Sequence, residues 1–187
     1  MAENDAPGGL KLVQDFVNTA DVEAAEDDWS APGAFAAWAT SNGLPVGGPV
    51  TDDEVLWARK VREALRVTIE VNNGNDPDPE AVKVLDEAGV RARFALCFDP
   101  GCEVGCEGRL EPRAPGVDGT IGLVLAEVYK AMENGTWTRL KACHRHTCRW
   151  AFYDNARNRS GKWCSMATCG NREKAKSYRA RRSEEHA

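Results

Sequence analysis

Four cysteines near the C-terminus have the spacing of a metal-binding site. Two Cys-x4-Cys pairs are separated by 15 residues: Cys143 and Cys148 form the first, Cys164 and Cys169 the second. Each pair can occupy one tight turn, and two turns together supply four thiolates for a tetrahedral zinc ion. The alternative uses of the same residues are two disulfides or ordinary buried thiols. We predict the zinc site.

Two histidines, His144 and His146, lie inside the first cysteine pair. Four cysteines already complete a tetrahedron, so we expect both histidines to be exposed polar residues, with a mixed Cys/His site as the alternative. A zinc ion held by four thiolates has no open position for water or substrate. We therefore predict one structural Zn²⁺ per chain, no catalytic residues and no enzymatic activity.

Three further cysteines, Cys97, Cys102 and Cys106, form a second cluster in FALCFDPGCEVGCEG. Three thiols would make an incomplete metal site or a redox-sensitive loop. We expect exposed or half-buried thiols without a function.

The charge is distributed very unevenly along the 187 residues, whose net charge is −5. Residues 1–136 hold 11 basic and 25 acidic residues, whereas residues 137–187 hold 13 basic and 4 acidic residues. This predicts two units with different partners, an acidic unit, 1–136, and a basic zinc unit, 137–187. The basic unit is the candidate for phosphate-rich partners. Docking of the two units on each other is an alternative that does not exclude the first.

The basic unit contains two clusters of cationic side chains, one in the turn NARNRSG and its continuation, and one in the predicted helix GNREKAKSYRARR at 170–182. Such residues bind phosphates with a strong salt dependence but without sequence choice. The alternative is a solvated helix, or a tail that pairs with the acidic unit. The predicted nucleic-acid-binding residues are Arg157, Arg159, Lys162, Arg172, Lys174, Lys176, Arg179, Arg181 and Arg182.

Asparagines and tryptophans near the cysteines have alternative roles, in binding nucleic acid or in stabilising the metal site. Asn155, Asn158 and Asn171 can read base edges, although Asn171 can instead brace a cysteine turn. Trp150 and Trp163 can stack on unpaired bases. We expect both tryptophans to pack over the metal site.

The remaining elements follow from hydrophobic periodicity and from start and stop signals. Helices are expected at 10–20, 33–40, 79–89 and 118–134, and a longer one begins after a capping box formed by Thr51 and Glu54 and ends at NNGN, 72–75. Strands are expected at 91–98 and 107–113, and in the basic unit a strand at 149–153, a turn and a return. The predicted fold is α+β, mainly α: a helical N-terminal domain with a small β-hairpin, then a small treble-clef or ribbon-like zinc finger with a C-terminal helix.

The basic unit also resembles a known family, the CGNR zinc finger. Cys-x4-Cys is followed by RWAFYDNARNRSGKWCSM and by the tetrad Cys169-Gly170-Asn171-Arg172, over residues 138–182. The N-terminal LVQDFVNTAD, 12–21, is similar to the start of the ABATE domain, which commonly precedes this finger. The resemblance implies a bacterial, stress-linked transcription regulator with a DNA-binding finger, zinc ligands at the four cysteines, and a domain that senses an effector.

The other expectations concern surroundings and partners. No apolar run approaches the roughly 20 residues that span a bilayer, and the acidic MAENDAPGG is not a secretory signal. We therefore expect a cytoplasmic protein without membrane contact. The partners that we expect are DNA, an effector at the N-terminal domain and a second copy of the chain in a homodimer. An RNA-binding or protein-interaction module, and an enzyme or thiol switch, are the alternative classes. Asn18-Thr19-Ala20-Asp21 either lines a ligand pocket or ends a helix.

Overall fold

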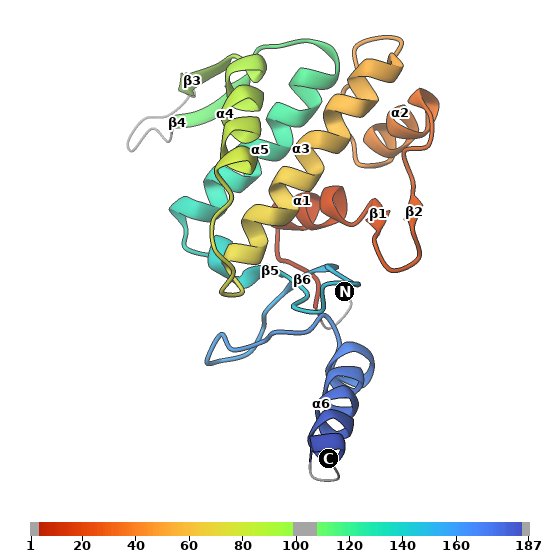
Figure 1. Ribbon diagram of the computed structural model, residues 1–187. Coiled ribbons are helices and arrows are strands. Elements are labelled where there is room, and N and C mark those ends of the chain that lie inside the picture. Colours follow the sequence, from red (N-terminus) through yellow and green to blue (C-terminus); the bar gives the residue numbers. More distant parts are fainter. Residues whose placement is uncertain (1–3, 99–107, 185–187) are drawn as a thin grey trace.

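A computed structural model of the chain describes residues 4–98 and 108–184 (Figure 1). A helical body fills one end, a small cysteine-bearing unit lies beneath it, and the last helix projects away from both. The α-helices are α1 (Leu10–Val17), α2 (Pro32–Ser41), α3 (Asp52–Val71), α4 (Pro79–Ala92), α5 (Gly116–Glu133) and α6 (Asn171–Glu184). The strands are β1 (Ala20–Asp21), β2 (Glu26–Asp27), β3 (Phe94–Phe98), β4 (Gly108–Pro112), β5 (Leu140–Ala142) and β6 (Ala151–Tyr153). A 3₁₀ turn, η1 (Trp137–Arg139), and a π turn, η2 (Met166–Gly170), complete the order, so the predicted fold class is confirmed.

Helix starts in the body follow the predicted capping chemistry. The Thr51 side chain accepts from the Glu54 backbone N–H, and the Glu54 carboxylate accepts from the Thr51 N–H, which confirms the capping box of α3. The Asp78 side chain caps α4 by accepting from the Glu80 N–H, with Pro79 at the first helical position, where its missing N–H costs nothing. Both helices are therefore specified locally.

The end of α4 differs from the prediction. The helix passes Gly89 and ends at Ala92, and Arg93 closes it in the left-handed conformation with φ 51°. The strand expected from 91 consequently begins at Phe94. A glycine in a helix costs only about 1 kcal/mol relative to alanine, and burial of Ala88 and Ala92 against the body outweighs it.

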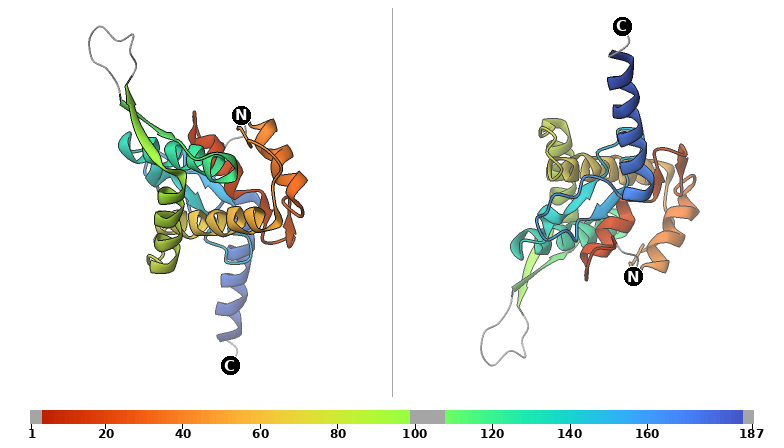
Figure 2. Two further views of the ribbon diagram at one scale, coloured as in Figure 1. Left: turned by 90° about the horizontal axis from the view of Figure 1, so that it is seen from above. Right: turned by 90° about the horizontal axis from the view of Figure 1, so that it is seen from below.

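A two-stranded ribbon, β3 and β4, projects from the body beside α4 and α5 (Figure 2). The predicted hairpin is confirmed, with Leu96 opposite Leu110. Cys97 is half-buried and free. Cys102 and Cys106 lie outside the described residues, so the interpretation of that cluster stays a prediction.

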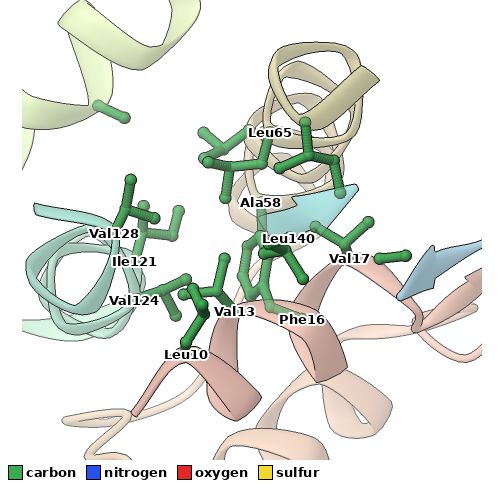
Figure 3. Close-up of a cluster of buried hydrophobic side chains, with 14 of the residues drawn as sticks. Leu10, Val13, Phe16, Val17, Ala58, Leu65, Ile121, Val124, Val128 and Leu140 are labelled. Atoms are coloured by element: carbon green, nitrogen blue, oxygen red, sulfur yellow. The ribbon is translucent and has the colours of Figure 1, made fainter. Parts of the chain in front are cut away.

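The core forms where α1, α3 and α5 meet (Figure 3). Phe16, Leu65 and Ile121 from the three helices are each at most 1% exposed. An aromatic cluster of Phe16, Trp29, Phe35 and Trp38 fills the space beneath α2, with edge-on ring contacts at 5.0–5.5 Å between most centroids.

The core continues past residue 136 into the basic unit. Trp137, Leu140, Ala151 and Tyr153 belong to the same buried cluster as the body helices. Strands β5 and β6 therefore pack on α1 and α3 and do not form a separate core. The division of the chain at 136 and 137 stays a prediction.

No helix in the described ranges is both long and apolar enough to cross a membrane.

Candidate metal centre and the basic surface around it

The first cysteine pair sits on the turn that connects β5 to β6. The Cys143 N–H donates to the Trp150 carbonyl at 2.9 Å, and the Cys148 N–H donates to the Arg145 carbonyl at 2.8 Å. The first bond extends the two-stranded ladder, and the second closes the turn. Arg149, with φ 52°, brings the chain back into β6.

The second cysteine pair lies just before the last helix. Cys164 precedes η2, Cys169 lies within it, and α6 follows directly. The Ser165 hydroxyl accepts from the Thr168 N–H at 3.3 Å, and the Ser165 carbonyl accepts from the Gly170 N–H at 3.0 Å. A hairpin turn and a helix start thus supply two ligands each, as in a treble-clef finger.

The four sulfur atoms form one compact, largely buried cluster. The Sγ atoms of Cys143, Cys148, Cys164 and Cys169 all lie within 4.8 Å of one another. The Cys148–Cys164 and Cys164–Cys169 sulfur distances are both 3.7 Å. Sulfurs bound to one zinc at about 2.3 Å are about 3.8 Å apart along a tetrahedron edge, whereas a disulfide needs about 2.05 Å. The residues therefore fit one structural zinc ion, and the disulfide alternative is not supported.

Repulsion between the thiolates of the cluster favours a bound cation. Hydrogen bonds from Cys148 and Cys164 lower the pKa of Cys143 to about 2. Its hydrogen bond and negative charge raise the pKa of Cys148 to about 12, and they also raise the pKa of Cys164. Neighbouring thiolates repel one another, so four of them require a positive ion at the centre.

The side chains beside the cluster take the roles expected of them. Trp150 and Trp163 are half-buried and pack against the cysteines, which confirms the packing interpretation. His144 and His146 are exposed and do not belong to the sulfur cluster. The His144 ring instead contacts Trp163 edge-on at 5.7 Å between centroids.

The pairing of the finger's strand corrects the sequence prediction. A return after the turn NARNRSG was expected to pair with the strand at 149–153, but β6 pairs with β5, which precedes the first cysteine. Residues 161–165 form no strand. β5 has no alternating pattern in LKA, because all three residues are buried, and this burial could not be read from the sequence.

A buried ion pair between Lys141 and Asp154 holds the basic turn in place. Lys141 Nζ lies 2.7 Å from Asp154 Oδ2 and also donates to the Arg159 and Gly161 carbonyls. Burial alone would raise the pKa of Asp154, but the bonds from Lys141 and from the Ala156 and Gly161 N–H groups lower it. The turn is thus held rigidly while Arg157 and Arg159 stay exposed.

The predicted nucleic-acid residues fall into two exposed groups. Arg157, Arg159 and Lys162 lie on the turn, and the others lie on α6, which contacts mainly η2 and stands clear of the body (Figure 2). Asn171 donates to the Ala167 carbonyl at 3.2 Å and so braces the second cysteine turn. Arg172 departs from the expectation of a free phosphate ligand, because it donates to Glu23 at 2.6 Å.

The acidic body docks on the basic unit through further ion pairs. Glu23 also accepts from Arg145 at 2.8 Å, and these bonds lower the pKa of Glu23. Glu70 at the end of α3 accepts from Arg149 at 2.5 Å. The docking alternative therefore describes part of the molecule, alongside the exposed cations of α6.

Several residues that join the body to the finger could not be predicted, because their side chains form hydrogen bonds with backbone groups far away in the sequence. The buried Arg66 guanidinium donates to the Val17, Ala20 and Arg149 carbonyls. Asn73 donates to the Ala142 and Lys162 carbonyls, and Asn18 bonds the backbone of Ala151. Only the motif LVQDFVNTAD carried a signal, since it contains Asn18, which both ends α1 and reaches the finger.

The geometry defines a structural zinc finger that follows a helical domain. Residues 139–182 match the CGNR zinc finger family. Residues 10–132, about two thirds of the chain, match the ABATE family, described as "Putative stress-induced transcription regulator", and the chain belongs to this family. The order of the two matches confirms the resemblance seen in the sequence. A comparison with curated proteins found no match.

Proposed function

We propose that this protein is a bacterial, cytoplasmic transcription regulator that binds DNA through α6 and the basic turn of its zinc finger. The observation that carries the proposal is the exposure of α6. Six cations stand on a helix that leaves the body, and the same helix contains only two acidic residues, Glu173 and Glu184. Its 14 residues extend about 21 Å, and the DNA major groove admits such a helix.

The metal has a mechanical role in this proposal. The zinc ion would join the β5–β6 turn to the start of α6 and thereby hold the helix at a fixed angle to the basic turn. A 14-residue helix with almost no apolar face is marginal in water. The role of the zinc ion in this proposal is therefore to position the helix and not to catalyse a reaction, since four thiolates leave no position for substrate.

DNA binding is tested by the salt dependence of affinity. We expect the zinc-loaded protein to bind a duplex with a slope of log K against log salt of about −5 or steeper, since each phosphate contact contributes about −0.9. Replacing Lys176 and Arg179 by Gln should reduce the slope by about 2. The matched control replaces Lys83 and Lys130, which are exposed in ion pairs on α4 and α5. Absence of duplex binding, or binding insensitive to salt, contradicts the proposal.

An RNA-binding or protein-interaction module is the second candidate. A cavity of about 620 Å³ in the finger is lined by Trp163, Tyr153 and Asn155, among others, and the neighbouring Met166 side chain is 51% exposed. Aromatic and amide groups of this kind receive unpaired bases. Preference for single strands over duplex in direct competition would favour this candidate.

The sensing role of the N-terminal domain belongs to the proposal as well. A cavity of about 530 Å³ opens between α1 and α2, and its walls include Asn18, Trp38 and Trp150. A small effector bound there would touch both the body and the finger. A homodimer on a two-fold DNA site is compatible with one basic helix per chain, and light scattering with and without DNA tests it.

A further inference from the structure

Two arginines of the zinc finger converge on one carboxylate oxygen of the body. Arg145 Nη1 lies 2.8 Å, and Arg172 Nη1 2.6 Å, from the same Oε1 atom of Glu23. Arg145 belongs to the first cysteine turn, and Arg172 follows the last cysteine by three residues. The cysteine cluster therefore holds the two guanidiniums next to each other, whatever anion lies between them.

Glu23 reaches this position from an ordered turn between β1 and β2. The Asp21 carboxylate accepts from the Glu23 and Ala24 N–H groups, both at 2.9 Å, and Ala25 adopts φ 56° to close the turn. The side chains of Glu23 and Arg172 are 39% and 57% exposed. Exposed ion pairs contribute little to stability, so another anion can replace the carboxylate readily.

We propose that Arg145 and Arg172 form a phosphate-binding site, and that Glu23 occupies this site until a DNA phosphate displaces it. Guanidinium groups bind the oxygens of carboxylates and of phosphates through the same charge-assisted hydrogen bonds. Glu23 thereby acts as an internal competitor that weakens DNA binding. The identity of the phosphate as DNA rests on the proposed function.

The position of the site agrees with the path of the basic helix. Arg172, Lys176 and Arg179 are spaced i, i+4 and i+7, which places them on one side of α6. Their side chains are exposed, apart from the contact of Arg172 with Glu23. A phosphate between Arg145 and Arg172 would therefore begin a row of contacts that continues along the helix.

The test compares two charge-neutralising variants of one hairpin. Glu23→Gln removes the competing charge, and Glu26→Gln, on β2, removes the same charge from an exposed side chain with no ion pair among the described residues. For the zinc-loaded full chain, fluorescence anisotropy with a labelled duplex should show about fivefold tighter binding for Glu23→Gln and under twofold for Glu26→Gln. Adding Arg172→Gln to Glu23→Gln should abolish the gain. Equal gains from the two variants, or weaker binding by Glu23→Gln, overturn the proposal.

A second measurement separates this site from the DNA function. Titration with inorganic phosphate, followed by the Nε–H NMR signals of Arg145 and Arg172, should shift both signals at lower phosphate concentration in Glu23→Gln than in the parent protein. The signal of Arg93, an exposed residue that closes α4 and donates to the Arg113 carbonyl, is the internal control. If no variant binds DNA but these shifts occur, the site stands and the DNA function falls. Identical titrations in the two proteins overturn the site.

Discussion

The side-chain amide of Asn18 pairs with the backbone of Ala151 in both directions. Asn18 Nδ2 donates to the Ala151 carbonyl at 2.9 Å, and Asn18 Oδ1 accepts from the Ala151 N–H at 2.8 Å. The amide thus takes the place of a neighbouring strand at the edge of β6 that does not pair with β5, where the Tyr153 N–H also donates to the Asn4 carbonyl. This contact joins residues 133 positions apart in the chain. It connects Asn18, the C-cap residue of α1, to the zinc finger.

Replacement of Asn18 by Ala should lower the free energy of unfolding by about 2 kcal/mol, because the Ala151 N–H loses its partner and the Ala151 carbonyl keeps only the bond from Gln14. Urea denaturation of the zinc-loaded protein measures the change. Asn75→Ala, at an exposed position after α3, should change stability by less than about 0.5 kcal/mol. Equal effects of the two variants would show that the Asn18 contact does not join the units.

Replacement of Cys164 by Ser should abolish stoichiometric zinc, since three thiolates no longer complete the tetrahedron. Metal analysis after gel filtration should give one zinc per chain for the parent protein and for Cys97→Ser, whose thiol lies outside the cluster. Chelation should expose the half-buried Trp150 and Trp163 and red-shift their fluorescence. Zinc retained at full occupancy by Cys164→Ser would contradict the four-cysteine site.

Replacement of Lys141 by Met should destabilise the protein by about 3–5 kcal/mol, because it leaves Asp154 buried without its cation. Their side chains are only 5% and 2% exposed. Lys83→Met breaks an exposed pair with Glu80 and should cost under about 0.5 kcal/mol. Adding Asp154→Asn to Lys141→Met should recover part of the loss, and no recovery would argue against an electrostatic cause.

The stability of the body should depend on pH through Asp27. Burial would raise the pKa of Asp27, but the hydrogen bonds from Arg62 and Trp29 and the charge of Arg62 lower it overall. A lowered folded-state pKa means that the contribution is present above the unfolded value of about 3.9 and is lost as pH falls through the folded value. Asp27→Asn should therefore cost about 3 kcal/mol at neutral pH.

The same variant gives the control for that pH dependence. The stability difference between the parent protein and Asp27→Asn should shrink as pH falls below about 4, where Asp27 becomes protonated in the unfolded chain, and should be lost once pH falls below the lower pKa of the folded state. A difference that stays constant down to low pH would assign the loss to packing. Arg62, whose side chain is 4% exposed, loses the Asp27 carboxylate and keeps its ion pair with Glu63.

Local chemistry explains the parts of the fold that could be predicted. Thr51 with Glu54, and Asp78 with Pro79, specify helix starts through hydrogen bonds within a few residues, so no distant contact is needed. The zinc ligands could be predicted equally well, because the spacing of Cys143, Cys148, Cys164 and Cys169 requires only that each pair occupy a turn. The end of α4 was missed because burial of Ala92 outweighed the helix-breaking signal of Gly89.

The role of the N-terminal motif could not be predicted in this way. In LVQDFVNTAD, Asn18 bonds Ala151 and Asp21 caps the turn that presents Glu23 to Arg145 and Arg172. The contacts of Asn18 with Ala151 and of Glu23 with the two arginines join residues more than 100 positions apart, and such pairings leave no periodic pattern in either segment. The sequence indicated that the motif ends a helix, and only the structure shows that it also holds the finger.

By itself, the sequence determined the composition of the metal site, the sign of each half's charge and the starts of most helices, since these depend on neighbouring residues. Tertiary structure decided which strand pairs with β6, where Lys141 is buried, and which cations remain available to an external anion. Arg172 shows the difference: its charge is evident from its residue type, but its contact with Glu23 depends on how the body and the finger pack. Packing over long sequence distances therefore sets the availability of that charge.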